Sequence, residues 1–180
     1  MQRTIKYFLL SLFTTVILVS CGNGESLQRY YVDHQEAKNF ISQDLPLSMI
    51  EIDKSQFTEA QKEAYESVNK LNFLGYKVND NNVEEYNAEL AKVKTILSNS
   101  KYNDLMQFSD RGNKISVKYI GTDDEADEVI LFGSSKETGF GVVRVLGNDM
   151  SPDKMVTLIE VLQKANIQSD QIENVMNFFK

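Results

Sequence analysis

The sequence is short of the residues that build metal, redox and nucleic-acid sites. Its 180 residues include one cysteine, one histidine and no tryptophan. A closed zinc site needs about four N or S ligands, and a disulfide framework needs paired cysteines. The 19 Lys and Arg against 26 Asp and Glu give a net charge of −7. Because nucleic-acid binding depends mainly on basic side chains, we expect no nucleic-acid partner. Because cysteine and histidine are so scarce, we also expect no metal and no cofactor.

The remaining composition is that of a folded protein. An apolar share of 42% is enough for a packed core, and 180 residues suit one domain or two very small ones.

The first twenty residues have the pattern of a secretory signal. Arg3 and Lys6 precede the uncharged apolar run of residues 7–19, which is too short to cross a bilayer comfortably at about 1.5 Å rise per residue. Leu18-Val19-Ser20-Cys21 follows, with small residues ahead of the cysteine. This arrangement resembles the lipobox of bacterial lipoproteins, in which the cysteine thiol is acylated and the chain is cut before it.

We therefore divide the chain into a lipoprotein signal peptide (1–20), the lipidated Cys21 with a short tether (21–26) and a single α+β globular domain (27–180). Without residues 1–20 the net charge changes from −7 to −9, because Arg3 and Lys6 are lost. The alternative is a secreted protein cut near Ser20, which would leave Cys21 as a spare thiol. A lone exposed thiol in an oxidising compartment has no evident use, so we favour lipidation, with several acyl chains giving a stable anchor.

The tether places the domain close to its membrane. Residues 22–26 reach at most about 18 Å at ~3.6 Å per residue. Some surface lipoproteins carry an acidic run after the cysteine, whereas here only Glu25 is acidic. We expect the protein to be anchored in the outer membrane and to face the periplasm.

Apolar stripes at helical spacing predict four helices, which start near Ser26, at the capping box Thr58–Gln61, after Asn82 and after Ser151. Two further helical pieces are predicted at 102–108 and 169–179. Runs of alternating or β-branched residues predict about five strands, at residues 39–45, 71–78, 115–119, 129–132 and 140–146.

The connections at 121–127 and 133–139 are too short for parallel crossovers and favour an antiparallel meander. The predicted fold is α+β, a mostly antiparallel twisted sheet with its helices packed on one face as a two-layer sandwich.

Two polar features could suggest a ligand. Asp123, Glu125 and Asp127 copy alternate positions of a calcium loop, but Glu128 replaces its glycine and Ser134 its final glutamate. We interpret residues 123–128 as a solvated acidic hairpin.

His34 falls on the apolar stripe of the first predicted helix. We interpret it as a packed histidine, since no second His or Cys accompanies it.

Gly139-Phe140-Gly141 with Gly147 superficially suggests a phosphate loop, but residue 144 is Arg in an apolar β run. Strand glycines more often allow a bulge or close packing. We interpret Lys136, Glu137 and Arg144 as surface or cross-strand charges. A set of tyrosines could line a binding groove, although their spacing favours positions at the edge of the core: Tyr30, Tyr31, Tyr76, Tyr86, Tyr102 and Tyr119.

Three segments, residues 26–31 (SLQRYY), 102–106 (YNDLM) and 139–147 (GFGVVRVLG), are similar to the domain of unknown function 4252 family, small lipoproteins of the Bacteroidota. The resemblance implies lipidation at Cys21. It carries no catalytic or ligand-binding residues with it, and the neighbourhood of envelope sigma factors in that family would suit envelope sensing.

These observations predict a non-enzymatic, membrane-anchored lipoprotein that interacts with an envelope protein or a small ligand, with no catalytic residue assigned. The alternatives are a hydrolase that uses two carboxylates and a lipoprotein with a tyrosine-lined ligand cavity.

Overall fold

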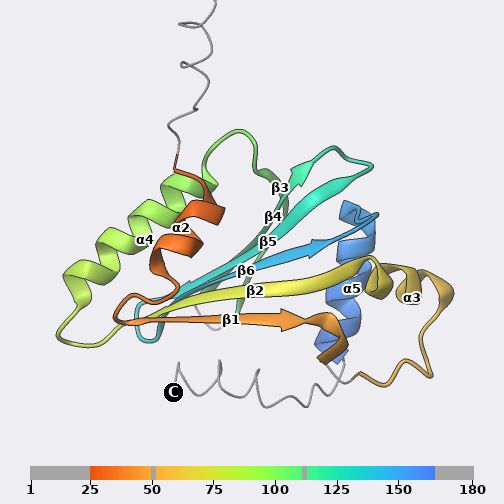
Figure 1. The fold of residues 1–180 in the computed structure, drawn as a ribbon, viewed down its shortest axis with the longest axis horizontal. Coiled ribbons are helices and arrows are strands. Elements are labelled where there is room, and N and C mark those ends of the chain that lie inside the picture. The colour runs from red at the N-terminus through yellow and green to blue at the C-terminus, as the bar shows by residue number, and fades with distance from the viewer. Residues whose placement is uncertain (1–24, 50–51, 111–112, 165–180) are drawn as a thin grey trace, which may run out of the picture.

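The computed structural model describes residues 25–49, 52–110 and 113–164 of the chain. These residues form four helices, a short 3₁₀ turn and six strands (Figure 1). In chain order they are α2 (Leu27–His34), β1 (Phe40–Pro46), η2 (Leu47–Met49), α3 (Glu59–Glu66), β2 (Val68–Lys77), α4 (Val83–Leu97), β3 (Asn103–Asp110), β4 (Asn113–Gly121), β5 (Ala126–Ser135), β6 (Gly139–Gly147) and α5 (Pro152–Lys164).

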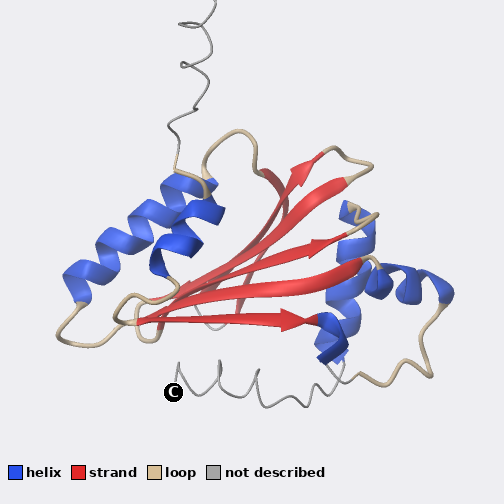
Figure 2. Cartoon of the chain, viewed as in Figure 1, coloured by secondary structure: helices blue, strands red, loops and turns tan. Residues whose placement is uncertain are grey.

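The strands form one open sheet in the order β1-β2-β6-β5-β4-β3. Each neighbouring pair is antiparallel, and Figure 2 shows the sheet as a single twisted layer. Strands β3 to β6 form a meander joined by short turns, and β2 pairs with β6, the last strand of this meander. The predicted α+β class and antiparallel sheet are therefore confirmed, with six strands among the described residues instead of about five.

The additional strand is β3, where the sequence predicted a helical piece, and that prediction is wrong. The ladder between β3 and β4 shifts register between Asp104 and Met106. Leu105 and Met106 consequently pack against the same apolar cluster although they are adjacent in sequence. A bulge of this kind hides the alternation that identifies a strand.

The helices are divided between the two faces of the sheet, which differs from the expected arrangement on one face. Neighbouring residues of a strand point to opposite faces, and Leu74, Ile130 and Val142 belong to one apolar cluster, together with α2 and α4. Val129 and Val145 belong to a second cluster, together with α3 and α5. Figure 1 shows the two helix pairs at opposite ends of the sheet. We call these faces the α4 face and the α5 face.

Local signals place the helix starts where the sequence predicts them. The Ser26 hydroxyl accepts from the backbone N–H of Arg29, and Thr58 and Gln61 form a reciprocal capping box. The Ser151 hydroxyl accepts from the backbone N–H of Lys154 at the start of α5. Cys21, the signal segment and the helix predicted at 169–179 lie outside the described residues. Within those residues, no helix is long and apolar enough to cross a membrane.

Candidate functional site

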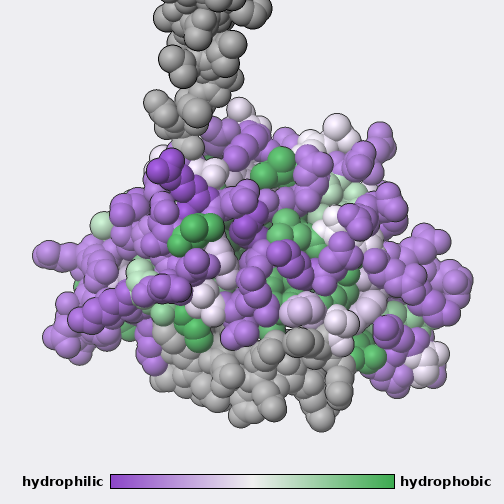
Figure 3. Space-filling view, viewed as in Figure 1, coloured by the Kyte–Doolittle hydropathy of each residue, from purple (hydrophilic) through white to green (hydrophobic). Residues whose placement is uncertain are grey.

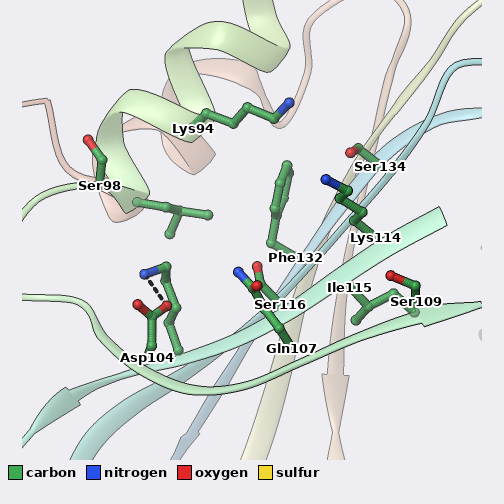
Figure 4. A pocket seen from close by; sticks show the side chains of 12 residues that line it. Lys94, Ser98, Asp104, Gln107, Ser109, Lys114, Ile115, Ser116, Phe132 and Ser134 are labelled. Carbon is green, nitrogen blue, oxygen red and sulfur yellow. Dashed lines mark hydrogen bonds and ion pairs between the residues drawn. The ribbon is translucent and has the colours of Figure 1, made fainter.

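A groove on the α4 face lies between the last turn of α4 and strands β3 to β5, with a volume of about 680 Å³. This volume falls within the range of small-molecule sites, which is roughly 300–1,000 Å³. Its lining has three lysines, one acid, four serine hydroxyls, one amide and an apolar part (Figure 4): Lys94, Lys114 and Lys118; Asp104; Ser98, Ser109, Ser116 and Ser134; Gln107; Leu97, Ile115 and Phe132. We call it the basic groove.

Secondary structure explains how the basic groove acquires its polar rim. Lys114, Ser116 and Lys118 alternate along β4, so their side chains share one face of the sheet. Across the ladders, Ser116 is opposite Gln107 of β3 and Phe132 of β5. Three neighbouring strands therefore contribute one row of side chains to the groove.

The charges of the basic groove are unevenly balanced. The Nζ atom of Lys118 lies 2.6 Å from Oδ1 of Asp104, and only 16% of the Lys118 side chain is exposed. Lys94 and Lys114 are exposed and have no ion-pair partner within the described residues. In Figure 4 both extend beyond the ring of Phe132, whereas Asp104 lies at the other end of the groove. A chain with net charge −7 thus has a locally positive concave site.

The inner part of the basic groove is apolar. Phe132 and Leu97 are 8% and 4% exposed and belong to the core of the α4 face. They therefore present a fixed surface, because their positions are determined by packing. A rigid apolar surface beneath exposed cationic side chains suits a ligand with both an acid group and an apolar part.

His34 belongs to a network between α2 and α4. The Tyr30 hydroxyl donates to Oε2 of Glu89 at 2.8 Å, and Nε2 of His34 lies 3.4 Å from the same oxygen. Lys92 donates to Oε1 of Glu89 at 2.6 Å. Burial alone would raise the pKa of Glu89, but the hydrogen bonds from Lys92 and Tyr30 lower it overall. The network joins two helices, as expected for a packed histidine.

The tyrosines are mostly core residues. Tyr30, Tyr31, Tyr76, Tyr86 and Tyr102 belong to the α4-face core, and Tyr119 belongs to the α5-face core. Burial, together with the nearby Glu85, raises the pKa of Tyr76 to about 12. These rings do not line the basic groove, so the interpretation of a core position agrees with the structure.

Arg144 is a buried cross-strand charge. Its Nε and Nη2 atoms lie 2.6 Å and 2.9 Å from the two carboxylate oxygens of Glu128. Nearby on the same face, Asp44 accepts hydrogen bonds from the Tyr31 hydroxyl and the Asn72 amide. Burial would lower the pKa of Arg144, but the hydrogen bonds and charge of Glu128 raise it.

The glycines of the 139–147 segment have a structural role. Gly139 has φ +123°, and a Cβ atom there would collide with the backbone carbonyl of Tyr76. A Cβ at Gly147 would collide with the carbonyl oxygen of Ser67. These two glycines therefore permit close backbone approach at both ends of the β2–β6 ladder, as proposed for strand glycines.

Residues 122–125 connect β4 to β5 and are exposed, as expected for a solvated hairpin. The interpretation is wrong for Ala126 and Glu128 of β5, because Ala126 is buried and only 12% of the Glu128 side chain is exposed. Oδ1 of Asp123 accepts from the Tyr119 hydroxyl at 2.6 Å. Within the described residues, no three His, Cys, Asp or Glu side chains are grouped as metal ligands.

The basic groove is not predictable from local sequence patterns. Helical spacing after Asn82 and alternation at 115–119 predict the elements that carry Lys94 and Lys118, but not that these elements line one cavity. The available signal was the alternation of Lys114, Ser116 and Lys118 in an acidic chain. It could not be linked to Lys94 or Phe132 without the strand pairing.

The fold and site define a class: a small α+β domain with an open antiparallel sheet and a basic groove on one face. Residues 30–158 match the sequence model of a family described as Domain of unknown function (DUF4252). The chain belongs to this family, and the resemblance inferred from its sequence is confirmed. No curated protein and no solved structure was found to match the chain.

Proposed function

We propose that the chain is a non-enzymatic, lipid-anchored module of the bacterial cell envelope that binds a small anionic ligand in the basic groove. The observation that supports this proposal is the presence of two unpaired lysines, Lys94 and Lys114, over an apolar surface. Cationic side chains around a concave site attract anions and raise their local concentration.

The arrangement of acids favours binding over carboxylate-dependent hydrolysis. A two-carboxylate mechanism needs two acids that face each other across the substrate, about 5–9.5 Å apart. Among the described residues that line the basic groove, the one carboxylate is Asp104, and Lys118 neutralises it. Elsewhere, Glu89, Asp44 and Glu128 are occupied by hydrogen bonds from named donors.

A small ligand also suits the surface better than a large apolar partner. Within the described residues, the large hydrophobic side chains that are exposed are Val32 and Val83. On the face shown in Figure 3, hydrophobic patches are separated by hydrophilic side chains. A protein partner would more commonly require a continuous apolar patch.

The groove proposal is tested with the full chain in phosphatidylcholine nanodiscs and ligand-observed ¹⁹F NMR. The probe is trifluoromethylbenzoate, and trifluoromethylbenzamide is its uncharged counterpart. Lys94→Gln with Lys114→Gln should weaken binding of the acid about tenfold, since this corresponds to about 1.4 kcal/mol of lost attraction. Lys70→Gln with Lys136→Gln, which changes two exposed lysines outside the groove, should leave it unchanged. Equal binding of the acid and the amide would contradict the proposal.

The anchor is tested separately by membrane fractionation. The parent protein should stay with membranes after a high-salt wash because its acyl chains are buried in lipid. Cys21→Ser should release the protein to the soluble fraction, since the charge of the chain does not favour anionic lipid. Retention of the Cys21→Ser variant after the wash would refute lipid anchoring through this residue.

A further inference from the structure

We infer that the ligand of the basic groove is an amphipathic anion, an alkyl chain that ends in a carboxylate or phosphate, and that it enters from the membrane side of the domain. This inference rests on the proposed function and specifies its ligand class. Three features support it: the two ends of the groove differ in charge, its inner surface is apolar, and it lies beside the start of α2, where the proposed tether ends.

The ends of the groove differ in available charge. Lys118 is already neutralised by Asp104 at 2.6 Å. Lys94, from α4, and Lys114, from β4, lack such a partner within the described residues, and they are located on the other side of the Phe132 ring (Figure 4). An acid group is therefore attracted to the end with Lys94 and Lys114, which fixes the direction of the ligand.

The apolar surface continues from the cationic end toward the neutral end. Phe132 comes from the sheet and Leu97 from the last turn of α4, and both line the groove while they remain nearly buried. The exposed lining of the groove as a whole is more apolar than polar, and an inorganic anion would leave this apolar lining in contact with water. An alkyl chain would cover it, and burial of apolar area would add to the attraction of the acid group.

The groove is next to the point where the proposed tether joins the domain. The backbone N–H of Leu27, the first residue of α2, donates to the Tyr102 hydroxyl at 3.3 Å. Tyr102 follows α4 closely, and Leu97 and Ser98 at the end of α4 line the groove. Figure 1 shows the start of α2 beside the end of α4. With Cys21 anchored, residues 22–26 reach at most about 18 Å at ~3.6 Å per residue, so this end of the domain is held close to the bilayer.

The test is photolabelling of the full chain in phosphatidylcholine nanodiscs. The probes are dodecanoic acid, dodecanol and butanoic acid, each with a diazirine on its chain, and labelling of the chain is normalised to labelling of the nanodisc scaffold. This normalisation corrects for the different partitioning of the probes into lipid. The dodecanoic acid probe should label peptides that cover β3 to β5 about tenfold more strongly than either other probe.

Variants locate the labelled site. Lys94→Gln with Lys114→Gln should reduce labelling by dodecanoic acid about tenfold, whereas the matched pair Lys70→Gln with Lys136→Gln should not change it. Ser116→Phe, which fills the middle of the groove from β4, should also abolish labelling there. Circular dichroism and the urea midpoint establish that each variant is folded.

The outcomes separate this inference from the proposed function. Equal labelling by butanoic and dodecanoic acid, both dependent on the two lysines, would overturn the amphipathic ligand and leave anion binding intact. Equal labelling by dodecanoic acid and dodecanol would overturn both. If labelling requires both the long alkyl chain and the acid group, phosphatidylglycerol is added to the nanodisc as a competitor. Weaker labelling by dodecanoic acid then identifies the ligand as a membrane lipid, and unchanged labelling identifies it as a free amphiphile.

Discussion

The buried pair of Arg144 and Glu128 allows a sharp test of how the sheet is stabilised. The two side chains are 9% and 12% exposed, and two hydrogen bonds of 2.6 Å and 2.9 Å join them in a fork. Arg144→Met keeps much of the apolar stem but removes the guanidinium. The Glu128 carboxylate is then left in a site that water barely reaches.

The expected cost follows from the loss of this partner. Removal of one member of a buried ion pair typically destabilises a protein by about 3–5 kcal/mol. The small residual exposure of both side chains favours the lower end, about 3 kcal/mol. Replacement of both charges by apolar residues, Arg144→Met with Glu128→Leu, should return the free energy of unfolding to within about 1 kcal/mol of the parent value, because no unpaired charge remains.

Urea unfolding followed by circular dichroism measures these differences. At a typical slope of about 2 kcal/mol per molar urea, Arg144→Met should lower the midpoint by about 1.5 M. The control is Lys62→Met, which breaks the exposed pair of Lys62 with Glu59 and should leave the midpoint unchanged. A shift for Arg144→Met no larger than that of the control would refute the argument. A double variant less stable than the single variant would also refute it.

Three further perturbations test other parts of the fold. Gly147→Ala should destabilise the domain by about 3 kcal/mol, because its Cβ would collide with the Ser67 carbonyl, whereas Gly133→Ala, with Ile115 Cγ1 at 3.7 Å, should have little effect on the melting temperature. Thr58→Ala should cost about 1 kcal/mol through loss of the capping box of α3, and Thr95→Ala, at an exposed position of α4, is its control in urea unfolding. Burial raises the pKa of Tyr30, Tyr31 and Tyr76 above 10, the ordinary pKa of tyrosine. The stability that each of these tyrosines contributes is therefore complete below pH 10. It should fall as the pH rises toward 12, by about 1.4 kcal/mol per pH unit for each tyrosine. Tyr30→Phe should reduce that slope by one such contribution, and an unchanged slope in alkaline urea titrations would contradict this assignment.

Local patterns were sufficient to predict most elements of the fold. The Thr58 capping box, the Ser151-Pro152 helix start and the alternation in β4 depend on neighbouring residues, so a single sequence reveals them. The helical prediction at 102–108 failed because Leu105 and Met106 are adjacent apolar residues, and only the register shift against β4 explains them.

Long-range pairing was not predictable, and the division of the helices depends on it. The central strands β2, β6 and β5 carry apolar residues on both faces, as Ile130 and Val129 show for β5. Such a strand needs cover on both sides. The sequence displays these apolar runs but not which helix packs on which side. The basic groove was missed for the same reason, because Lys94 and Lys114 become neighbours of one cavity only through the fold.

The pairing of β2 with β6 has a consequence for how the domain assembles. Strands β3 to β6 can pair successively through short turns, and β1 pairs with β2, and these two sets of strands pair with each other along the ladder from Val68–Gly147 to Lys77–Gly139. Contacts between distant parts of a chain form slowly, because loop closure costs entropy before the contacts compensate it. The groove lies between α4 and β3 to β5, so it exists only when α4 is packed on the sheet. A ligand bound there would therefore stabilise the packed position of α4 on these strands, by an amount that grows with ligand concentration.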